Sequence, residues 1–479
     1  MHRQTKIVAT IGPSSARPDV LSRMLAAGLD VARLNFSHGS ADDHRRNAVM
    51  LRELAEGLGR EVAIMADLQG PKIRVGKFAE GRVTLEPGEP FVLCAHPVEG
   101  TAERVSLDYP ELVNEVAKGD VLVLNDGAIV LDVQGVAGLE IATVVRVGGE
   151  LSNNKGINRQ GGGLSAPALT PKDIADLEVA IGLGADLVAV SFPKCAADMQ
   201  HARALVEQFS QPGAPRPKLI AKIERAEAIP ALQEIIDACD GIMVARGDLG
   251  VEVGIAAVPA LQKKMIKMAR ASNRLTITAT QMMESMISSS IPTRAEVSDV
   301  ANAVLDGTDA VMLSAESATG RYPVQAIEAM VNICEEAIKL RTSQPDNDML
   351  MGDLSRVDEA TAVSAVFAAY RLGASALVAL TESGAAPLWM SRHCTSIPIY
   401  GVTRSVATAR WMTLFQNVEP IVPQQWIDHA EVVRDVEQLL LERGVVKAGD
   451  LMVVTCGDPR AASGGTNGMK IVGVGNMPL

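Results

Sequence analysis

Short apolar runs with the composition of β-strands alternate with amphipathic helical segments along most of the chain, a pattern typical of a parallel sheet. Most of the helical segments open with Pro, Ser, Thr or Asp and end in Gly, as helices do, for example PDVLSRMLAAG and TRAEVSDVANAVLDG. The strand-like runs cover residues 6–10, 31–36, 62–67, 186–192, 218–224, 241–248, 275–281 and 310–316. Eight strand–helix units predict an α/β fold, a (β/α)8 TIM barrel. A doubly wound sheet is the second choice, because it would usually have fewer strands and a glycine-rich turn after the first.

The alternation of strands and helices is interrupted between the third and fourth strand-like runs. From about residue 70 to residue 164 the sequence has short alternating runs separated by Gly, Pro and Asn-Asp, which predicts a small β-barrel inserted on a barrel loop. Its exit, NNKGINRQGGGLSAP, is rich in glycine and could form a hinge. The stretch TSQPDNDMLMGDLS then predicts a linker to a second α/β unit. We therefore expect a barrel of residues 1–69 and 165–342, an inserted β-barrel domain of residues 70–164 and a C-terminal α/β domain of residues 343–479.

Composition describes an ordinary globular protein, with 47% apolar and 21% charged residues. A formal charge of −12 argues against a general nucleic-acid-binding protein, whose affinity depends on neutralising phosphates. No signal peptide and no apolar span of membrane length is apparent, so we expect a cytoplasmic protein without a membrane partner. The six cysteines are scattered without a CxxC pair, as in reduced cytoplasmic proteins. The seven histidines form no HxH or HExxH motif, which argues against a histidine-ligated metal.

Polar side chains end most of the strand-like runs, and in a barrel these ends meet at one mouth. A single charge there is often part of a structural salt bridge, but several charges at one mouth indicate an active site, since buried charges are costly unless paired or ligating. The polar residues at these ends are Arg33, Asn35, Ser37, Asp67, Lys222, Glu224, Arg246, Asp248, Thr278, Thr280, Ser314 and Glu316.

These residue types favour phosphoryl transfer. Glu224 and Asp248 are hard oxygen ligands suited to Mg²⁺, which takes one or two carboxylates and completes its shell with substrate and water. Arg33, Arg74 and Lys222 supply positive charge where phosphoryl oxygens carry charge in the transition state. Neither a Walker A motif nor a protein-kinase glycine-rich loop is present, so the phosphate site is of another kind.

The stretch DLQGPKIRVG, residues 67–76, places Lys72 and Arg74 on either side of one isoleucine. If the chain is extended there, both cations point the same way, because side chains alternate along a strand. Two cations on one side repel each other unless an anion lies between them. The pattern therefore predicts that this segment faces an anionic ligand.

The sequence resembles the pyruvate kinase family. The resemblance rests on VARLNFSHG, DLQGPKIRVG, KIERAEAI, MVARGDLGVE and TATQMMESM followed by PTRAE, and it extends through the barrel, the insert and the C-terminal unit. It implies transfer of the phosphoryl group of phosphoenolpyruvate to ADP, giving pyruvate and ATP in glycolysis. It also implies Mg²⁺, or Mn²⁺, as cofactor and a homotetramer. The inserted domain of residues 70–164 would act as a lid.

The resemblance implies roles for individual residues. Arg33 would hold the phosphoryl group, Lys222 would stabilise it during transfer, and Glu224 and Asp248 would bind Mg²⁺. The backbone N–H groups of Gly247 and Asp248 would receive the substrate carboxylate, and Thr280 would lie near the carbon that is protonated. The nucleotide would be contacted by Asn35, Ser37, His38, Arg74 and, from the lid, Lys155.

The resemblance also suggests why the sequence has two cations, Lys72 and Arg74, so close together. Many members carry a glutamate at the position of Lys72 and bind K⁺ in a pocket that here would comprise Asn35, Ser37, Asp67 and the carbonyl of Leu68. In another branch lysine replaces that glutamate and leucine replaces a neighbouring threonine, and this chain has both, at Leu68 and Lys72. A fixed ammonium would replace the monovalent ion, so the chain is expected to be independent of K⁺. The alternative is that Lys72 forms a salt bridge with Asp67 while K⁺ still binds.

The C-terminal unit resembles the regulatory domain of the family. Thr381, Ser383 and Gly384 form a turn suited to phosphate, although an ordinary helix cap favours the same residues. Ala385 and Ala386 follow, where members that bind fructose 1,6-bisphosphate carry hydroxyl or basic residues. The expected allosteric effector is therefore a sugar monophosphate or a nucleoside monophosphate, with the loop of residues 456–467 as the other wall.

Two other functions remain open from the residues alone. A barrel lyase or aldolase acting on phosphoenolpyruvate or an oxoacid would share the strand with Lys222 and Glu224 but would need no nucleotide site. A catalytically silent metabolite sensor would have lost at least one of Arg33, Lys222, Glu224 and Asp248, and all four are present.

Overall fold

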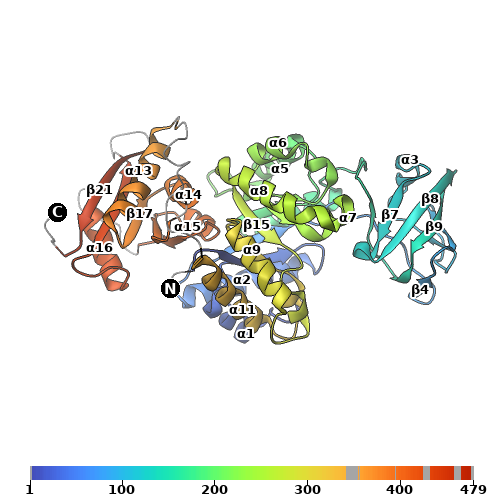
Figure 1. Ribbon diagram of the computed structural model, residues 1–479, viewed down its shortest axis with the longest axis horizontal. Helices are drawn as coiled ribbons and strands as arrows, with labels where there is room; N and C mark the ends of the chain where they lie inside the picture. The colour runs from blue at the N-terminus through green and yellow to red at the C-terminus, as the bar shows by residue number, and fades with distance from the viewer. Residues whose placement is uncertain are drawn as a thin grey trace.

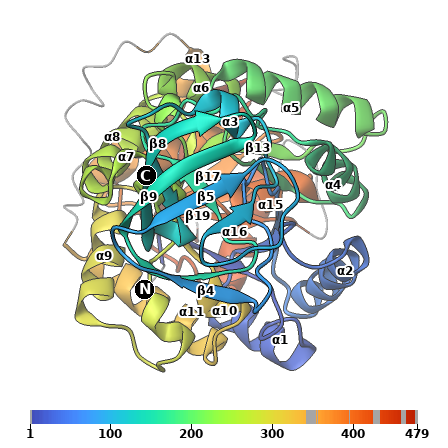
Figure 2. The ribbon, with the colours of Figure 1, turned by 90° about the vertical axis from the view of Figure 1, so that its right-hand side faces the viewer.

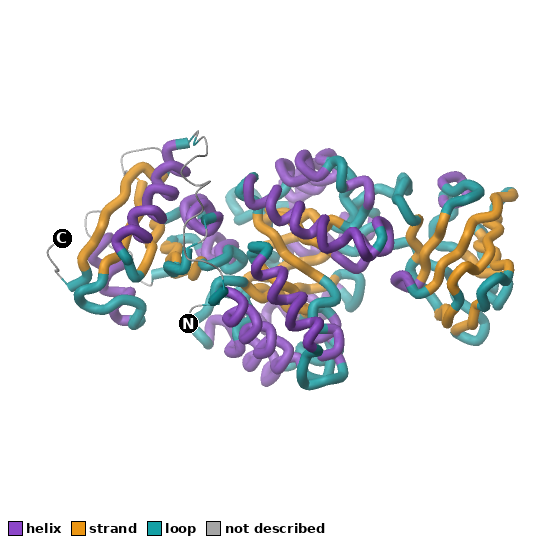
Figure 3. The backbone as a smooth tube through the Cα atoms, in the orientation of Figure 1, coloured by secondary structure: helices purple, strands orange, loops and turns teal. Residues whose placement is uncertain are grey.

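The computed structural model describes residues 3–340, 354, 356–393, 395–423, 432–457 and 465–475. Three parts lie in a row: a C-terminal α/β unit, a central barrel and a β-rich insert (Figure 1). In the barrel the strands form the centre and helices cover them, whereas the insert consists almost entirely of strands and loops (Figure 3). Most of the linker predicted from TSQPDNDMLMGDLS lies outside the described residues.

The central part is a closed barrel of eight parallel strands in the order β1-β16-β15-β14-β13-β12-β3-β2, which confirms the predicted fold. The strands are β1 (Lys6–Thr10), β2 (Val31–Asn35), β3 (Ala63–Asp67), β12 (Leu187–Val190), β13 (Lys218–Ile223), β14 (Gly241–Ala245), β15 (Leu275–Ala279) and β16 (Ala310–Leu313). Most predicted runs extend past the observed strands, most of all those of β14 and β16. Helix α7 begins at Arg246, directly after β14, and helix α10 begins at Ala315, with only Ser314 between it and β16.

Helices cover the outside of the barrel, and the predicted start and stop signals lie at their ends. Thr170 and Thr293 cap α4 and α9 by accepting backbone N–H groups, and Gly28 ends α1 in the left-handed region. The α-helices are α1 (Pro18–Ala27), α2 (Ala41–Gly57), α4 (Pro171–Gly182), α5 (Ala196–Phe209), α6 (Leu232–Ala238), α7 (Arg246–Val253), α8 (Val258–Ala271), α9 (Arg294–Leu305), α10 (Ala315–Ala318) and α11 (Pro323–Ile338). Short 3₁₀ turns are η2 (Ala226–Ala228), η3 (Ile255–Ala257) and η4 (Glu284–Ile287).

The insert follows β3 and consists of a curled six-stranded sheet, in the order β11-β7-β8-β9-β5-β6, and the pair β10-β4. It encloses its own apolar core, which includes Phe91, Leu122 and Ile141. Figure 2 looks onto this lid, whose strands lie in front of the barrel. Its elements are β4 (Arg82–Leu85), β5 (Pro90–Cys94), β6 (Arg104–Ser106), α3 (Leu112–Glu115), β7 (Val121–Leu124), η1 (Asn125–Gly127), β8 (Ile129–Ala137), β9 (Glu140–Val147), β10 (Gly149–Ser152) and β11 (Ile157–Arg159).

The C-terminal unit has a mixed sheet in the order β19-β18-β17-β20-β21, with β21 antiparallel to β20. It packs where the barrel strands begin: Arg392 pairs with Asp309 just before β16, and the N–H of Asn417 donates to the carbonyl of Gln4 just before β1. The lid is inserted after the end of β3, so the two units lie at opposite ends of the barrel. The elements are α13 (Val357–Leu372), β17 (Ala376–Leu380), α14 (Ala385–Arg392), β18 (Ile399–Val402), α15 (Val406–Met412), β19 (Val418–Ile421), α16 (Val432–Glu442), β20 (Leu451–Gly457) and β21 (Thr466–Gly473).

Within the parts of the chain that the structure describes, no helix has the length and apolar character needed to cross a lipid bilayer.

Candidate active site

Successive side chains on a barrel strand point alternately toward the surrounding helices and toward the barrel interior. On β13, Ala221 and Ile223 pack against the helices, whereas Ile220 joins the interior cluster, so that Lys222 and Glu224 share the inward side. The same alternation on β2 and β3 turns Arg33 and Asp67 inward, above Val31 and Met65. Apolar residues therefore fill the lower barrel, and charged residues gather where the strands end, as the sequence predicts.

Asp67 lies at the centre of this charged group and is 1% exposed. Its Oδ2 accepts a 2.6 Å hydrogen bond from Nε of Arg33, and its Oδ1 lies 3.1 Å from Nζ of Lys222. Arg33 also donates to Oγ1 of Thr10 at 2.8 Å. One buried carboxylate thus fixes the two cations in position, which is a prearranged site for an anion.

Ser191, at the end of β12, completes the support of Lys222. Nζ of Lys222 donates to the Ser191 hydroxyl at 2.7 Å, and that hydroxyl donates to the carbonyl oxygen of Leu68 at 2.6 Å. Sequence reasoning included Ser191 in a predicted strand but gave it no role. The signal was available, because Ser191 is the polar residue next to the end of the run DLVAVSF.

Glu224 contacts the same lysine, with its Oε1 3.0 Å from Nζ of Lys222. Its Oε2 accepts the backbone N–H of Phe192 at 2.9 Å. Burial and the neighbouring carboxylates of Asp248 and Asp67 raise the pKa of Glu224 to about 7, although Lys222 lowers it. The carboxylate is therefore held where negative charge is costly, and a bound cation would relieve that cost.

Burial would raise the pKa of Asp67 and lower that of Lys222, but charge pairing outweighs it in both. Arg33 and Lys222 hold the pKa of Asp67 below its ordinary value. Asp67 and Glu224 hold the pKa of Lys222 above its ordinary value. Lys222 is thus a permanent cation at neutral pH.

Lys72 reaches this group from the first residues of the lid segment, with its Nζ 3.6 Å from Oδ1 of Asp248. The alternative expectation of a salt bridge between Lys72 and Asp67 is wrong, because Arg33 and Lys222 already occupy Asp67. Burial alternates along the segment, with Ile73 and Val75 in the lid core, so Lys72 and Arg74 share the other side, as predicted.

Thr280 follows β15 with a φ of 67°, a strained conformation for a β-branched residue. Its hydroxyl accepts the N–H of Gly247 at 2.9 Å and donates to the carbonyl of Ala279 at 2.7 Å. Arg246 holds the strained turn by donating from Nη2 to the carbonyl of Thr280 at 2.7 Å, while its Nη1 donates to Asp299 at 2.7 Å. Strain stabilised by surrounding contacts is typical of a functional site.

Two polar residues of the predicted strand ends, Thr278 and Glu316, do not join the cluster around Asp67. Thr278 faces the helix layer and its hydroxyl donates to Oγ1 of Thr308 at 3.1 Å, because Leu275, Ile277 and Ala279 occupy the interior side of β15. Glu316 lies in α10, where it accepts the N–H groups of Ser314 and Met283. The sequence pattern grouped Glu316 with the site because its predicted run continues beyond the end of β16.

Glu224 and Asp248 fit a divalent cation. They lie close enough for Asp248 to raise the pKa of Glu224, and Mg²⁺ accepts two carboxylates with substrate oxygens and water completing its shell. These two carboxylates would hold the cation, and the bound cation would supply positive charge against the negative charge that develops on the substrate.

The residues expected to contact nucleotide come from two parts of the structure. Oδ1 of Asn35 accepts the N–H of Ser37 at 3.2 Å, and exposed His38 donates its N–H to the carbonyl of Asn35 at 3.1 Å. Arg74 and Lys155 belong to the lid, where the carbonyl of Lys155 accepts the N–H of Val75. The structure thus places two of the five residues on the lid.

The lid joins the barrel through the glycine-rich segment expected to form a hinge, and its three successive glycines at residues 161–163 have φ of 86°, 78° and 92°. A Cβ at Gly162 would lie 2.4 Å from a carboxylate oxygen of Glu227. The N–H of Gly161 donates to the carbonyl of Glu252, whose side chain accepts the N–H of Ala226 at 2.7 Å. Contacts with Glu227 and Glu252 therefore fix this segment to the barrel.

Glu252→Gln tests the cost of burying charge beside this segment. Burial and Glu227 raise the pKa of Glu252 to about 7, so Glu252 contributes stability below about pH 4.5 that is lost as pH rises through 7. Glutamine keeps the acceptor without the charge. We expect the variant and wild type to melt alike near pH 4.5, and the variant to melt several degrees higher above pH 7.

Thermal unfolding followed by circular dichroism between about pH 4.5 and about pH 9 measures this difference. Glu56→Gln, at an exposed position in α2, is the control and should show no such trend. A difference between the Glu252 variant and wild type that stays constant across this range would contradict the buried-charge account.

The turn expected to bind an effector lies between β17 and α14. The N–H of Gly384 donates to Oγ1 of Thr381 at 2.9 Å, and the N–H of Ala385 donates to the Ser383 hydroxyl at 3.4 Å. Gly384 has a φ of 83°. The expected second wall, residues 456–467, lies partly outside the described residues.

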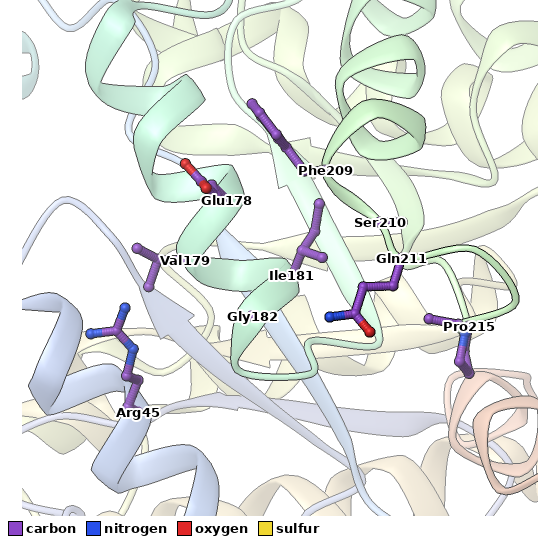
Figure 4. Close-up of a pocket in the computed structure, with 10 residues that line it drawn as sticks. Arg45, Glu178, Val179, Ile181, Gly182, Phe209, Ser210, Gln211 and Pro215 are labelled. Atoms are coloured by element: carbon purple, nitrogen blue, oxygen red, sulfur yellow. The ribbon is translucent and has the colours of Figure 1, made fainter.

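A cavity of about 730 Å³ lies elsewhere, between the carboxyl ends of α4 and α5 and Arg45 of α2 (Figure 4). Its lining includes Ile181, Phe209 and Pro215. The ends of α4 and α5 that line the cavity lead into the beginnings of β12 and β13, and none of the lining residues belongs to the cluster around Asp67. The cavity is not part of the candidate active site.

Comparison with known proteins agrees with this geometry. The family described as "Pyruvate kinase, barrel domain" matches residues 2–327, and "Pyruvate kinase, alpha/beta domain" matches residues 359–472. Pyruvate kinase II of Salmonella typhimurium is 47% identical over 478 residues, which cover 98% of this chain and 99% of the relative. Pyruvate kinase of Haemophilus influenzae is 47% identical over 461 residues, covering 95% and 96%. That of Mycobacterium intracellulare is 40% identical, covering 99% of each.

These matches exclude the barrel lyase and the silent sensor as alternatives. The chain belongs to the bacterial pyruvate kinases, glycolytic phosphotransferases that use a divalent metal and act on phosphoenolpyruvate and ADP.

Proposed function

We propose that this pyruvate kinase works without K⁺, because the ammonium of Lys72 supplies the positive charge that a monovalent ion would otherwise bring. The observation that carries the proposal is the position of Nζ of Lys72, 3.6 Å from Oδ1 of Asp248 at the edge of the charged cluster. Lysine at 72 together with leucine at 68 supports placing the chain in the branch of the family with a lysine in the potassium site.

Three of the four residues of the expected K⁺ pocket support this proposal, since protein groups already contact oxygen atoms of Asn35, Asp67 and Leu68. The carbonyl of Leu68 accepts the Ser191 hydroxyl, and Oδ1 of Asn35 accepts the N–H of Ser37. Asp67 contacts both Arg33 and Lys222. A monovalent ion would have to compete with each of these contacts and would find little uncompensated negative charge.

We propose the following roles in the reaction. Arg33 binds the phosphoryl group and Lys222 stabilises its charge during transfer. Glu224 and Asp248 hold Mg²⁺, and the start of α7 at Gly247 receives the substrate carboxylate. Thr280 lies beside the carbon that is protonated. Asn35, Ser37 and His38 contact the nucleotide from the barrel, and Arg74 and Lys155 contact it from the lid.

Pyruvate formation from phosphoenolpyruvate and ADP, measured in sodium buffer and again with added K⁺, tests the proposal. Comparable turnover under both conditions supports it.

We propose boundaries at residues 69/70, 164/165 and 342/343, which separate the barrel, the lid and the C-terminal domain. The glycine hinge at 161–163 lies beside the second boundary. Closing the lid would bring Arg74 and Lys155 to the nucleotide and exclude water that competes for the phosphoryl group. As a glycolytic enzyme, the protein is proposed to act in the cytoplasm.

We also propose a homotetramer. Ile255 and Ile291 are 82% and 71% exposed on the barrel, and such apolar side chains are suited to a subunit interface. Light scattering should give the mass of four chains.

An allosteric effector with a single phosphate is proposed at Thr381, Ser383 and Gly384. Ser383→Asp places a carboxylate where the phosphate would bind, so the effector should no longer lower the half-saturating concentration of phosphoenolpyruvate. Turnover without effector should be unchanged. Titrations with ribose 5-phosphate and AMP measure this, with Ser383→Thr as the variant that keeps the hydroxyl. An unaltered effector response in Ser383→Asp would contradict the assignment.

A further inference from the structure

The outer face of the lid sheet carries a buried thiol outside the apolar core. On β5, Phe91 and Leu93 point into the core, and Cys94, the last residue of the strand, lies on the opposite face. Cys94 is nevertheless 0% exposed and does not belong to the core cluster. His96 follows two residues later, just beyond the end of the strand, and lies close to the thiol.

Glu140 is the cross-strand partner of Cys94 in the antiparallel pair β5–β9. Oε1 of Glu140 lies 3.9 Å from Sγ of Cys94. A nitrogen of His96 completes the group, and the three donor atoms all lie within 4.8 Å of one another. Among the described residues this is the one group of three or more His, Cys, Asp or Glu side chains close enough to hold a metal ion.

We propose that Cys94, His96 and Glu140 form a second metal site, for a thiophilic divalent cation such as Zn²⁺. Zinc binds sulfur at about 2.3 Å and nitrogen or oxygen at about 2.1 Å, so tetrahedral ligands lie roughly 3.5 Å apart. The observed separation of 3.9 Å between Sγ of Cys94 and Oε1 of Glu140 is close to this value. Small rotations of the His96 and Glu140 side chains would bring all three donor atoms to the separation that a tetrahedral ion requires. On binding, the Cys94 sulfur–metal bond forms as the thiol proton leaves to solvent.

The chemistry of the donors separates this site from the catalytic one. Glu224 and Asp248 offer only oxygen, which suits Mg²⁺, whereas thiolate and imidazole favour zinc and cobalt. Nη1 of Arg104 lies 3.4 Å from Oε1 of Glu140 and would orient that carboxylate from outside the coordination shell. The side chains of Glu140 and Arg104 are 39% and 44% exposed, so an ion can enter from solvent.

The sequence has no HxH or HExxH motif, and for that reason a histidine-ligated metal was not predicted. Cys94 and His96 are separated by a single residue, and the third ligand comes from β9, more than forty residues later. Only the strand pairing brings it into place. The bound ion would link β5 to β9 and stiffen this edge of the lid.

Cobalt titration of the full-length enzyme tests the proposal. Chelator-treated protein in excess Mg²⁺ receives Co²⁺, and the near-ultraviolet charge-transfer absorption of thiolate-bound cobalt is recorded. Cobalt at the catalytic carboxylates gives no such band, because no sulfur lies there. We expect the band in wild type, its loss in Cys94→Ser, and at least about tenfold weaker binding in His96→Ala and Glu140→Gln. Zn²⁺ should displace the cobalt.

Cys195→Ser is the matched control, because Sγ of Cys195 also lies 3.9 Å from a carboxylate oxygen, that of Asp198, without forming a three-ligand group. This variant should keep the band. Turnover of Cys94→Ser near the wild-type rate would show that the variant folds. A wild-type enzyme without the band, or a band that survives Cys94→Ser, would overturn the proposal.

Discussion

Replacing Lys222 with methionine is expected to lower kcat by roughly 10³-fold, equivalent to about 4 kcal/mol of transition-state stabilisation. Lys222 is the cation that Asp67, Glu224 and the Ser191 hydroxyl hold in position. Methionine has nearly the same length but no charge, so the phosphoryl group would lose that stabilisation during transfer. Arg33 still binds the ground state, so the KM for phosphoenolpyruvate should change much less than kcat.

Lys218→Met is the matched control for this experiment. Lys218 lies four residues earlier at the opposite end of β13, where its ammonium is 5.7 Å from the centre of the Trp411 ring. Steady-state assays of both variants, with circular dichroism to confirm folding, should show near-normal turnover only for Lys218→Met. If Lys222→Met retained more than a few per cent of wild-type turnover, Lys222 would have another role.

Replacing Lys72 with glutamate is expected to make the enzyme dependent on K⁺. In potassium-free buffer the new carboxylate would lie near Asp248 without a compensating charge. The lost attraction at 3.6 Å is worth at most roughly 4 kcal/mol, and less after screening because Lys72 is partly exposed. Turnover should fall by about 10- to 100-fold without K⁺, and added K⁺ should restore most of it.

Lys77→Glu makes the same charge reversal five residues later, at an exposed position in the lid. It should leave turnover insensitive to K⁺, which separates a local effect from a change in net charge. Turnover of Lys72→Glu is measured over a range of K⁺ concentrations at constant ionic strength. A Lys72→Glu enzyme that stays fully active without K⁺ would show that Lys72 does not replace the ion.

Much of the fold could be predicted because the spacing of apolar residues and the helix start and stop signals indicate the same strands and helices. Strand β1 coincides with its predicted run, and α4 and α9 begin at capping threonines. The errors lie at strand ends. The sixth predicted run was continued through Arg246, Gly247 and Asp248, although Arg246 begins helix α7. Thr278 lies within β15 but faces the helices, because Leu275, Ile277 and Ala279 occupy the interior side of that strand.

Individual contacts in the site depend on geometry that spacing does not give. Ser191 meets Lys222 because β12 lies between β3 and β13 in the closed barrel. Lys72 was expected beside Asp67, but two cations from other strands reach that carboxylate first, and Lys72 lies beside Asp248 instead. Competition between cations for one carboxylate is a property of the folded site.

The central claim is that a built-in ammonium replaces K⁺, and wild-type turnover in rigorously potassium-free buffer tests it most directly. The assay follows pyruvate formation with saturating phosphoenolpyruvate, ADP and Mg²⁺, with tetramethylammonium maintaining ionic strength, and is repeated with K⁺ in its place. We predict comparable kcat under both conditions. An enzyme activated strongly by K⁺ would contradict the role assigned to Lys72.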